Sequence, residues 1–291
     1  MNYSLSSWRR TLRATLVITL LIQTAFGLQL HEKKESPYDL ALKGRLVGLA
    51  PGETRYLKWA ELRELPNRKI VLEGEFVPGK QEVTAVMLSD ILAMLPREAQ
   101  ADSLIATCTD GYASIYNEAF LTKYKPFLVL EINGKGPEQW PPEGLKFNPG
   151  PYVISITEVI VPEAKTLLDA GHKRPWGVDT LEFVNYADRF AGFYKGALAN
   201  PSDVIKEGRE LWVNSCFSCH NQPEKNLGGT KAAWPMQIVA THATHNAAYF
   251  RDYVRNPTKL NPMAKMEPHP HYTDAQLNAL IEFLKVTMAT P

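Results

Sequence analysis

The feature that most constrains this sequence is a five-residue motif, Cys216-Phe217-Ser218-Cys219-His220. Two cysteines three positions apart lie on one side of a single turn, so both thiols can reach the same edge of a ligand. Such a pair followed directly by histidine is the attachment signature of c-type haem. The thiols of Cys216 and Cys219 would add across two vinyl groups, and the imidazole of His220 would ligate the iron. The motif therefore predicts one covalent haem c.

Two other readings of a Cys-x-x-Cys pair are a zinc half-site and a thioredoxin-like redox pair. A zinc site needs a second pair of ligands, and the remaining cysteine, Cys108, lies far upstream. A thioredoxin-like pair follows a strand. Here the preceding segment opens on Pro201-Ser202-Asp203, a capped helix start, and carries apolar residues at helical spacing. Helical context favours haem attachment.

Residues 202–290 resemble a class I, single-haem cytochrome c. The resemblance rests on an ordered set of segments, which are Glu207–Trp212 before the haem motif, Gly228-Gly229, Tyr249–Pro257 ending in an Asn-Pro pair, Pro262–Met266, and Thr273–Gln276 before a last amphipathic helix. The resemblance implies an all-α domain in which the last helix crosses the first and closes the haem pocket.

The sixth iron ligand is a choice among several side chains. The family's ligand loop has a proline, three residues and then the ligand methionine, which fits Pro262 to Met266, with Met263 as the alternative. Met236 is expected to pack in the core. Imidazoles are further candidates in principle, and the sequence offers His242, His245, His269 and His271. The resemblance implies His220 and Met266 as the axial pair.

The first half of the chain mixes strands with few helices, which predicts an α+β fold. The expected strands cover residues 68–76, 103–109, 127–132 and 152–161, and the expected helix covers residues 89–95. Residues 137–151 are rich in proline and glycine and predict an irregular loop. The fold class expected for the whole chain is α+β, with a β-rich first domain followed by an all-α cytochrome c domain.

This first half resembles the molybdopterin-binding domain of the sulfite-oxidase superfamily, with Cys108-Thr109-Asp110-Gly111-Tyr112 as its cysteine loop. The resemblance implies Cys108 as a molybdenum ligand. However, the sequence has no arginine between Arg97 and Arg174 to cradle a phosphate-bearing pterin. Molybdenum cofactor is also inserted in the cytoplasm, whereas haem c is attached to an exported chain. We therefore expect a domain without molybdopterin and Cys108 as a buried strand residue.

With 291 residues, the length predicts about two domains. We place the first at residues 31–175 and the second at residues 201–291. Residues 176–200 are expected to form a linker helix, because the aromatic residues Phe183, Tyr186, Phe190 and Tyr194 follow one another at three-to-four spacing.

The first 30 residues are expected to be a targeting segment. Arg9, Arg10 and Arg13 precede a largely apolar run from Ala14 to Leu30. This pattern is typical of a signal peptide, with cleavage after Gly27, or of a single membrane anchor. Both readings place the rest of the chain in the periplasm or an equivalent compartment.

The charge balance excludes one class of partner. Lys and Arg number 32 against 31 Asp and Glu, a net charge of +1, so no global field attracts nucleic acid. The expected function is that of an exported electron carrier that serves a redox partner protein, with the first domain as a docking or assembly module. Two alternatives remain open: a molybdenum-dependent enzyme that passes electrons to its haem, and a fixed subunit of a respiratory or photosynthetic complex.

Overall fold

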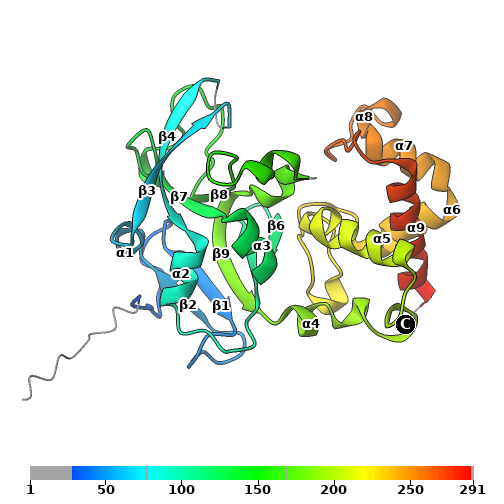
Figure 1. Ribbon diagram of the computed structural model, residues 1–291, viewed down its shortest axis with the longest axis horizontal. Coiled ribbons are helices and arrows are strands. Elements are labelled where there is room, and N and C mark those ends of the chain that lie inside the picture. Colours follow the sequence, from blue (N-terminus) through cyan, green and yellow to red (C-terminus); the bar gives the residue numbers. More distant parts are fainter. Residues whose placement is uncertain (1–27, 76–77, 168, 290–291) are drawn as a thin grey trace, which may run out of the picture.

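The computed structural model describes residues 28–75, 78–167 and 169–289. A β-rich part precedes a helical part, and the two lie beside each other in Figure 1. The expected α+β fold is confirmed. The targeting segment predicted over residues 1–30 lies almost wholly outside the described residues, as does Phe76 at the end of a predicted strand. In the described part of the chain, no helix has the length and apolar character needed to cross a membrane.

One mixed sheet organises the first part of the described chain. Its strands run in the order β2-β1-β9-β8-β7-β4-β3, with β5 paired to β9 and β6 paired to β5. The strands are β1 Leu40–Gly44, β2 Thr54–Leu57, β3 Asn67–Glu73, β4 Lys80–Met87, β5 Ser103–Cys108, β6 Ala113–Asn117, β7 Phe127–Ile132, β8 Tyr152–Ser155 and β9 Trp176–Val184. The pairing of β1 with β9 is parallel, and the other pairings are antiparallel. Strand β8 ends six residues before the predicted limit at 161.

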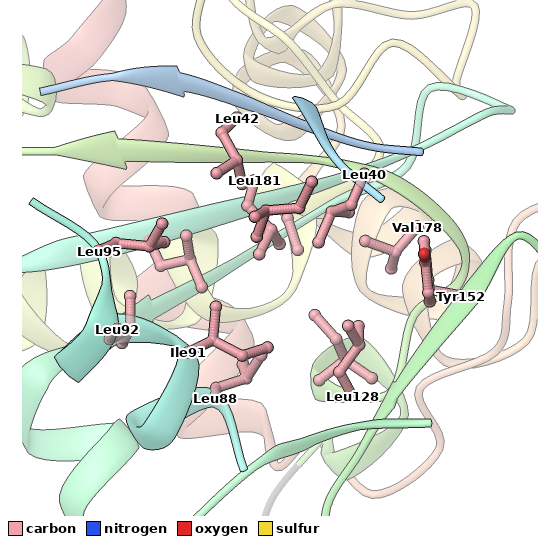
Figure 2. Close-up of a cluster of buried hydrophobic side chains, with 14 of the residues drawn as sticks. Leu40, Leu42, Leu88, Ile91, Leu92, Leu95, Leu128, Tyr152, Val178 and Leu181 are labelled. Carbon is pink, nitrogen blue, oxygen red and sulfur yellow. The ribbon is translucent and has the colours of Figure 1, made fainter. Parts of the chain in front are cut away.

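Short helices cover this sheet: α1 Trp59–Arg63, α2 Leu88–Met94 and α3 Glu118–Tyr124. Figure 2 shows Leu88, Ile91 and Leu92 of α2 pointing into the cluster that Leu181 of β9 and Leu42 of β1 also enter. Because these side chains sit at helical spacing on α2 and at alternate positions on the strands, each element buries one face. The short helix predicted at 89–95 is confirmed as α2.

The linker helix predicted over residues 176–200 is wrong. Residues 176–184 form β9, which pairs with β1, β5 and β8. Only short turns follow, namely α4 Tyr186–Arg189 and the 3₁₀ turns Ala191–Phe193 and Gly196–Leu198. Phe183 therefore packs from a strand and Phe190 from a turn, so their spacing of seven residues does not report a helix. Pairing with three strands outweighs the local aromatic periodicity.

The helical part comprises α5 Asp203–Asn214, α6 Met236–His245, α7 Ala247–Arg255, α8 Pro257–Leu260 and α9 Asp274–Ala289. The predicted start of α5 is confirmed, because the Ser202 hydroxyl accepts a hydrogen bond from the Ile205 amide. Helix α9 begins with a reciprocal cap in which the amide of Gln276 donates to the Thr273 hydroxyl and the Thr273 amide donates to the Gln276 side chain. Further 3₁₀ turns cover Pro137–Gln139, Pro162–Thr166, Ala170–Lys173, Cys216–Ser218 and Pro223–Lys225.

Helices α5 and α9 pack directly against each other, with Gly208 at the point of contact. A Cβ atom on Gly208 would collide with the backbone carbonyl of Ala279 and would lie 2.8 Å from Cβ of Phe283. Only glycine allows the two backbones to approach this closely. Gly208 therefore fixes the crossing of the first and last helices that the sequence predicts.

Gly208→Ala is expected to destabilise the helical part by about 2 kcal/mol, because overpacking costs about 1–3 kcal/mol and a rigid backbone cannot yield as a side chain can. The gain in helix propensity, about 1 kcal/mol, offsets only part of this. Denaturant unfolding followed by far-ultraviolet circular dichroism measures the change. Glu207→Ala, at an exposed position of the same helix, is the control and should leave stability within about 0.5 kcal/mol. Equal stabilities for the two variants would contradict this account of the crossing.

Residues of both parts contribute to the hydrophobic cluster of the helical part. On β5, Leu104 and Ala106 face the core of the sheet, whereas Ile105 joins the cluster around Trp212 and Phe283 of the helical part. The strand is buried on both faces, which explains why three apolar residues, Leu104, Ile105 and Ala106, follow one another in its middle without alternation. The sheet and the helices are therefore packed together over an apolar surface.

Candidate haem site

The Cys-x-x-Cys-His motif forms one tight turn directly after α5. The helix ends at Asn214, and Cys216–Ser218 form a 3₁₀ turn. The amides of Cys219 and His220 both donate to the carbonyl of Cys216, at 3.1 and 2.9 Å. These bonds fold the motif back on itself and hold both cysteines and the histidine on adjacent positions of one turn, as the spacing predicts.

The ring of His220 is held by a backbone group. Its Nδ1 lies 2.7 Å from the carbonyl oxygen of Trp234, which can only accept a hydrogen bond. The proton is thus assigned to Nδ1, and Nε2 keeps a free lone pair for a metal. Burial lowers the pKa of His220 and so favours the neutral imidazole. Orientation, tautomer and charge all suit an iron ligand.

A narrow apolar cleft of about 50 Å³ opens beside this turn. Cys216 and His220 line one part of it, and Met266 also reaches it. The remaining lining residues come mainly from α6 and α7 and are Trp234, Val239, His242, Tyr249, Phe250, Tyr253, Val254 and Leu280. A flat, largely apolar prosthetic group that is tethered at its edge and ligated by His220 fits this donor set and lining.

Among the described residues, neither thiol of the motif belongs to a group of ligand atoms close enough together to hold zinc. Burial raises the pKa of Cys216 to about 12 and that of Cys219 to about 11. Both side chains are therefore thiols at neutral pH as long as no metal is bound. The motif also follows helix α5 directly rather than a strand, which argues against a thioredoxin-like pair.

The candidate axial methionines occupy different environments. Met266 packs against the helical core and lines the cleft, whereas the side chain of Met263 is 82% exposed. Among the four candidate histidines only His242 lines the cleft. Its ring stacks on that of Trp234, with 4.9 Å between the ring centroids. The assignment of Met266 stays a prediction, with His242 as the other candidate that the cleft holds. Met236 is buried in the core, as expected.

Cys108 ends strand β5 and is 3% exposed. Burial, together with Asp110 and Asp179, raises the pKa of its thiol, and the nearby Lys231 is already paired with Asp110 at 2.8 Å. The loop that follows Cys108 is covered by the helical part, since the amide of Thr230 donates to the carbonyl of Gly111 at 2.7 Å. Cys108 is thus a buried thiol at the end of a strand, beneath a loop that the helical part covers.

Sequence reasoning missed the carbonyl of Trp234, because a backbone acceptor leaves no signature in residue type. The side of the cleft that α7 forms, in contrast, is visible in the sequence. Tyr249, Phe250, Tyr253 and Val254 recur at helical spacing, which marks one apolar face. Asn246 caps this helix by accepting from the Tyr249 amide, and the Asn256-Pro257 pair ends it, as predicted.

Comparison with protein families agrees with this geometry. Residues 203–284 match the family model of cytochrome C oxidase, cbb3-type, subunit III. The helical part is a cytochrome c domain. A cytochrome c domain implies haem c, transfer of electrons and a redox partner protein.

The cytochrome c domain accounts for less than a third of the chain, and no curated protein matches the chain. Among solved structures, the sulfane dehydrogenase SoxCD from Paracoccus pantotrophus is similar at 16% identity and a TM-score of 0.36. The match covers 53% of this chain and spans 40% of that one. A likeness this distant supports no conclusion about the function of this chain. The resemblance of residues 31–175 to a molybdopterin-binding domain therefore stays a prediction.

Proposed function

We propose that the chain is an exported electron carrier with one haem c, bound covalently through Cys216 and Cys219 and ligated by His220 and Met266. The observation that carries the proposal is the placement of Met266 and the oriented ring of His220 around one apolar cleft. When bound, the haem supplies a one-electron ferric/ferrous couple. The cleft excludes water from that couple, and thioether ligation by Met266 favours its reduced form.

Each residue of the turn has a defined task in this proposal. The thiols of Cys216 and Cys219 would hold the haem covalently by adding across its two vinyl groups, an addition that needs no oxidant. The Trp234 carbonyl accepts a hydrogen bond from Nδ1–H of His220 and so keeps Nε2 directed for ligation. Trp234 and Tyr249 are 47% and 42% exposed although they line the cleft. This aromatic rim supports docking of a redox partner at the mouth of the cleft.

The β-rich part acts in this proposal as a docking or assembly module without molybdopterin. The loop after Cys108 is engaged by Thr230 of the cytochrome c domain, and Ile105 packs into that domain's core. Such a shared core supports a fixed platform for the cytochrome c domain. In this proposal the first domain runs from residue 31 to 184, so that it includes β9, and the cytochrome c domain covers residues 201–291.

The proposed compartment is the periplasm or its equivalent. The pattern of Arg9, Arg10 and Arg13 before an apolar run supports export, as does the attachment of haem c outside the cytoplasm. The family match supports a second candidate function, that of a fixed subunit in a respiratory or photosynthetic complex. A haem-stained chain that stays in a large complex after mild detergent extraction of membranes would favour this second function, whereas a free chain would favour the carrier.

Metal analysis of the purified chain tests the proposal. We expect one iron per chain, no molybdenum, and the reduced absorption spectrum of a low-spin c-type haem. A stoichiometric content of molybdenum would overturn the carrier in favour of the enzyme. If the chain is expressed in cells that attach haem c and still contains no iron, both the carrier and the enzyme hypotheses are overturned.

A further inference from the structure

A cluster of ligating side chains lies where the two parts of the chain meet. Asp169 precedes the 3₁₀ turn Ala170–Lys173 of the β-rich part, and His269 and His271 belong to the loop before α9. Oδ1 of Asp169 lies 2.7 Å from Nε2 of His271 and 3.4 Å from Nδ1 of His269. None of the three lines the haem cleft. The cluster is therefore separate from the proposed haem site.

The spacing of these atoms suits a metal ion. One ligand atom from each residue lies within 4.8 Å of the other two. Tetrahedral zinc with bonds of about 2.0–2.2 Å places its ligand atoms about 3.4 Å apart. The separations of 2.7 and 3.4 Å from Oδ1 of Asp169 to the two imidazole nitrogens lie close to that value.

The carboxylate of Asp169 is oriented by neighbours that leave one oxygen for a ligand. Its Oδ2 accepts hydrogen bonds from the hydroxyl of Ser215, at 2.5 Å, and from the hydroxyl of Tyr272. Oδ1 faces the histidines instead. Hydrogen bonds to the second oxygen of a metal-binding carboxylate are the usual means by which proteins fix its direction.

The cluster also has the charge and access that a cation requires. Burial acts to raise the pKa of Asp169, but its hydrogen bonds with His269, Ser215 and Tyr272 outweigh burial and hold the pKa below its usual range. The Asp169 side chain is 5% exposed and carries a negative charge, whereas that of His271 is 41% exposed. A buried anion with one solvent-facing ligand gives an ion an entry route and a place for a water.

We propose that Asp169, His269 and His271 bind one divalent transition-metal cation, with zinc as the preferred ion. Two imidazoles and one carboxylate form a set of borderline and hard donors that also accepts copper and nickel. The ring of His172 stacks on that of His269, with 5.3 Å between the ring centroids. Because Nδ1 of His172 is already hydrogen-bonded to the Tyr112 hydroxyl, we assign His172 a packing role. Water completes the coordination.

The ion would join the two parts of the chain. Asp169 belongs to the β-rich part, whereas His269 follows Met266 by three residues in the cytochrome c domain. In the structure the Asp169 carboxylate is hydrogen-bonded to His271 and lies 3.4 Å from Nδ1 of His269. Coordination would replace them with bonds to one ion and fix the loop that carries Met266 against the β-rich part.

Titration of the metal-stripped full-length chain with Zn²⁺, monitored by calorimetry, tests the proposal. The chain is purified without a polyhistidine tag. We expect one Zn²⁺ per chain and a rise in the unfolding midpoint when Zn²⁺ is saturating. His271→Ala is expected to weaken binding by about 10–100-fold or more. Because His271 is partly exposed, this variant should keep its fold, which the haem absorption spectrum reports independently.

His245→Ala is the matched control, since His245 is an exposed histidine outside the cluster. It should bind Zn²⁺ as the unmodified chain does. Cu²⁺ gives a second readout, because its paramagnetic resonance spectrum should show coupling to two imidazole nitrogens and lose one of them in His271→Gln. Absence of stoichiometric Zn²⁺ binding, or equal affinities in His271→Ala and His245→Ala, would overturn the proposal whether or not the chain carries haem.

Discussion

Replacing Cys216 and Cys219 together by alanine is expected to remove all covalently bound haem, whereas Cys108→Ala should retain the full amount. The first two thiols lie on the turn that ends in His220, and Cys216 lines the cleft. Cys108 is buried at the end of β5, among residues of the sheet core. Haem staining after denaturing electrophoresis and the mass of the intact chain measure the attachment directly.

Single variants sharpen this comparison. Cys216→Ala and Cys219→Ala should each leave one thioether bond, which shifts the reduced absorption band because one vinyl group remains unsaturated. Cys108→Ala serves as the control for loss of a buried cysteine, since it changes the packing of the sheet without touching the turn. If Cys108→Ala also lost its haem while the chain stayed folded, the attachment site assigned to the turn would be wrong.

Local signals in the sequence were sufficient for the cytochrome c domain. The cap at Ser202, the Thr273-Gln276 pair and the Asn256-Pro257 break each fix a helix end through contacts within a few residues. Local rules predicted the start of α5, the family resemblance supplied the segments of α7 and α9, and the motif lies where α5 stops. These elements could be predicted because their determinants are near one another in the chain.

The rest depended on contacts between distant residues. Residues 176–184 form a strand because β1, β5 and β8 pair with them, and those partners lie up to 139 positions away, as in Ala41 opposite Thr180. The group that orients His220 is a carbonyl, which no residue type reveals. Asp169 meets His271 across 102 positions. Such pairs arise only when the sheet and the helices pack, so sequence patterns did not show them.

Met266→Ala is expected to abolish the weak thioether charge-transfer band of the oxidised protein and to lower the reduction potential, whereas Met263→Ala should change neither. Loss of the sulfur removes the ligand that favours ferrous iron. Both variants remove the same number of atoms from one loop, but only Met266 lines the cleft, and Met263 is 82% exposed. The near-infrared absorption spectrum and a redox titration measure the two effects.

His242→Ala completes the comparison, because His242 also lines the cleft and carries a ligating nitrogen. Its ring stacks on Trp234, so its loss should alter the wall of the cleft while the charge-transfer band persists. An oxidised spectrum without that band in the unmodified chain, followed by a new spectrum in His242→Ala, would instead identify a second imidazole on the iron. Loss of the band in Met263→Ala alone would require the ligand loop to refold so that residue 263 faces inward. With Met266 as ligand, only the Met266 variant should lose both the band and the high potential, since the iron then keeps His220 as its one protein ligand.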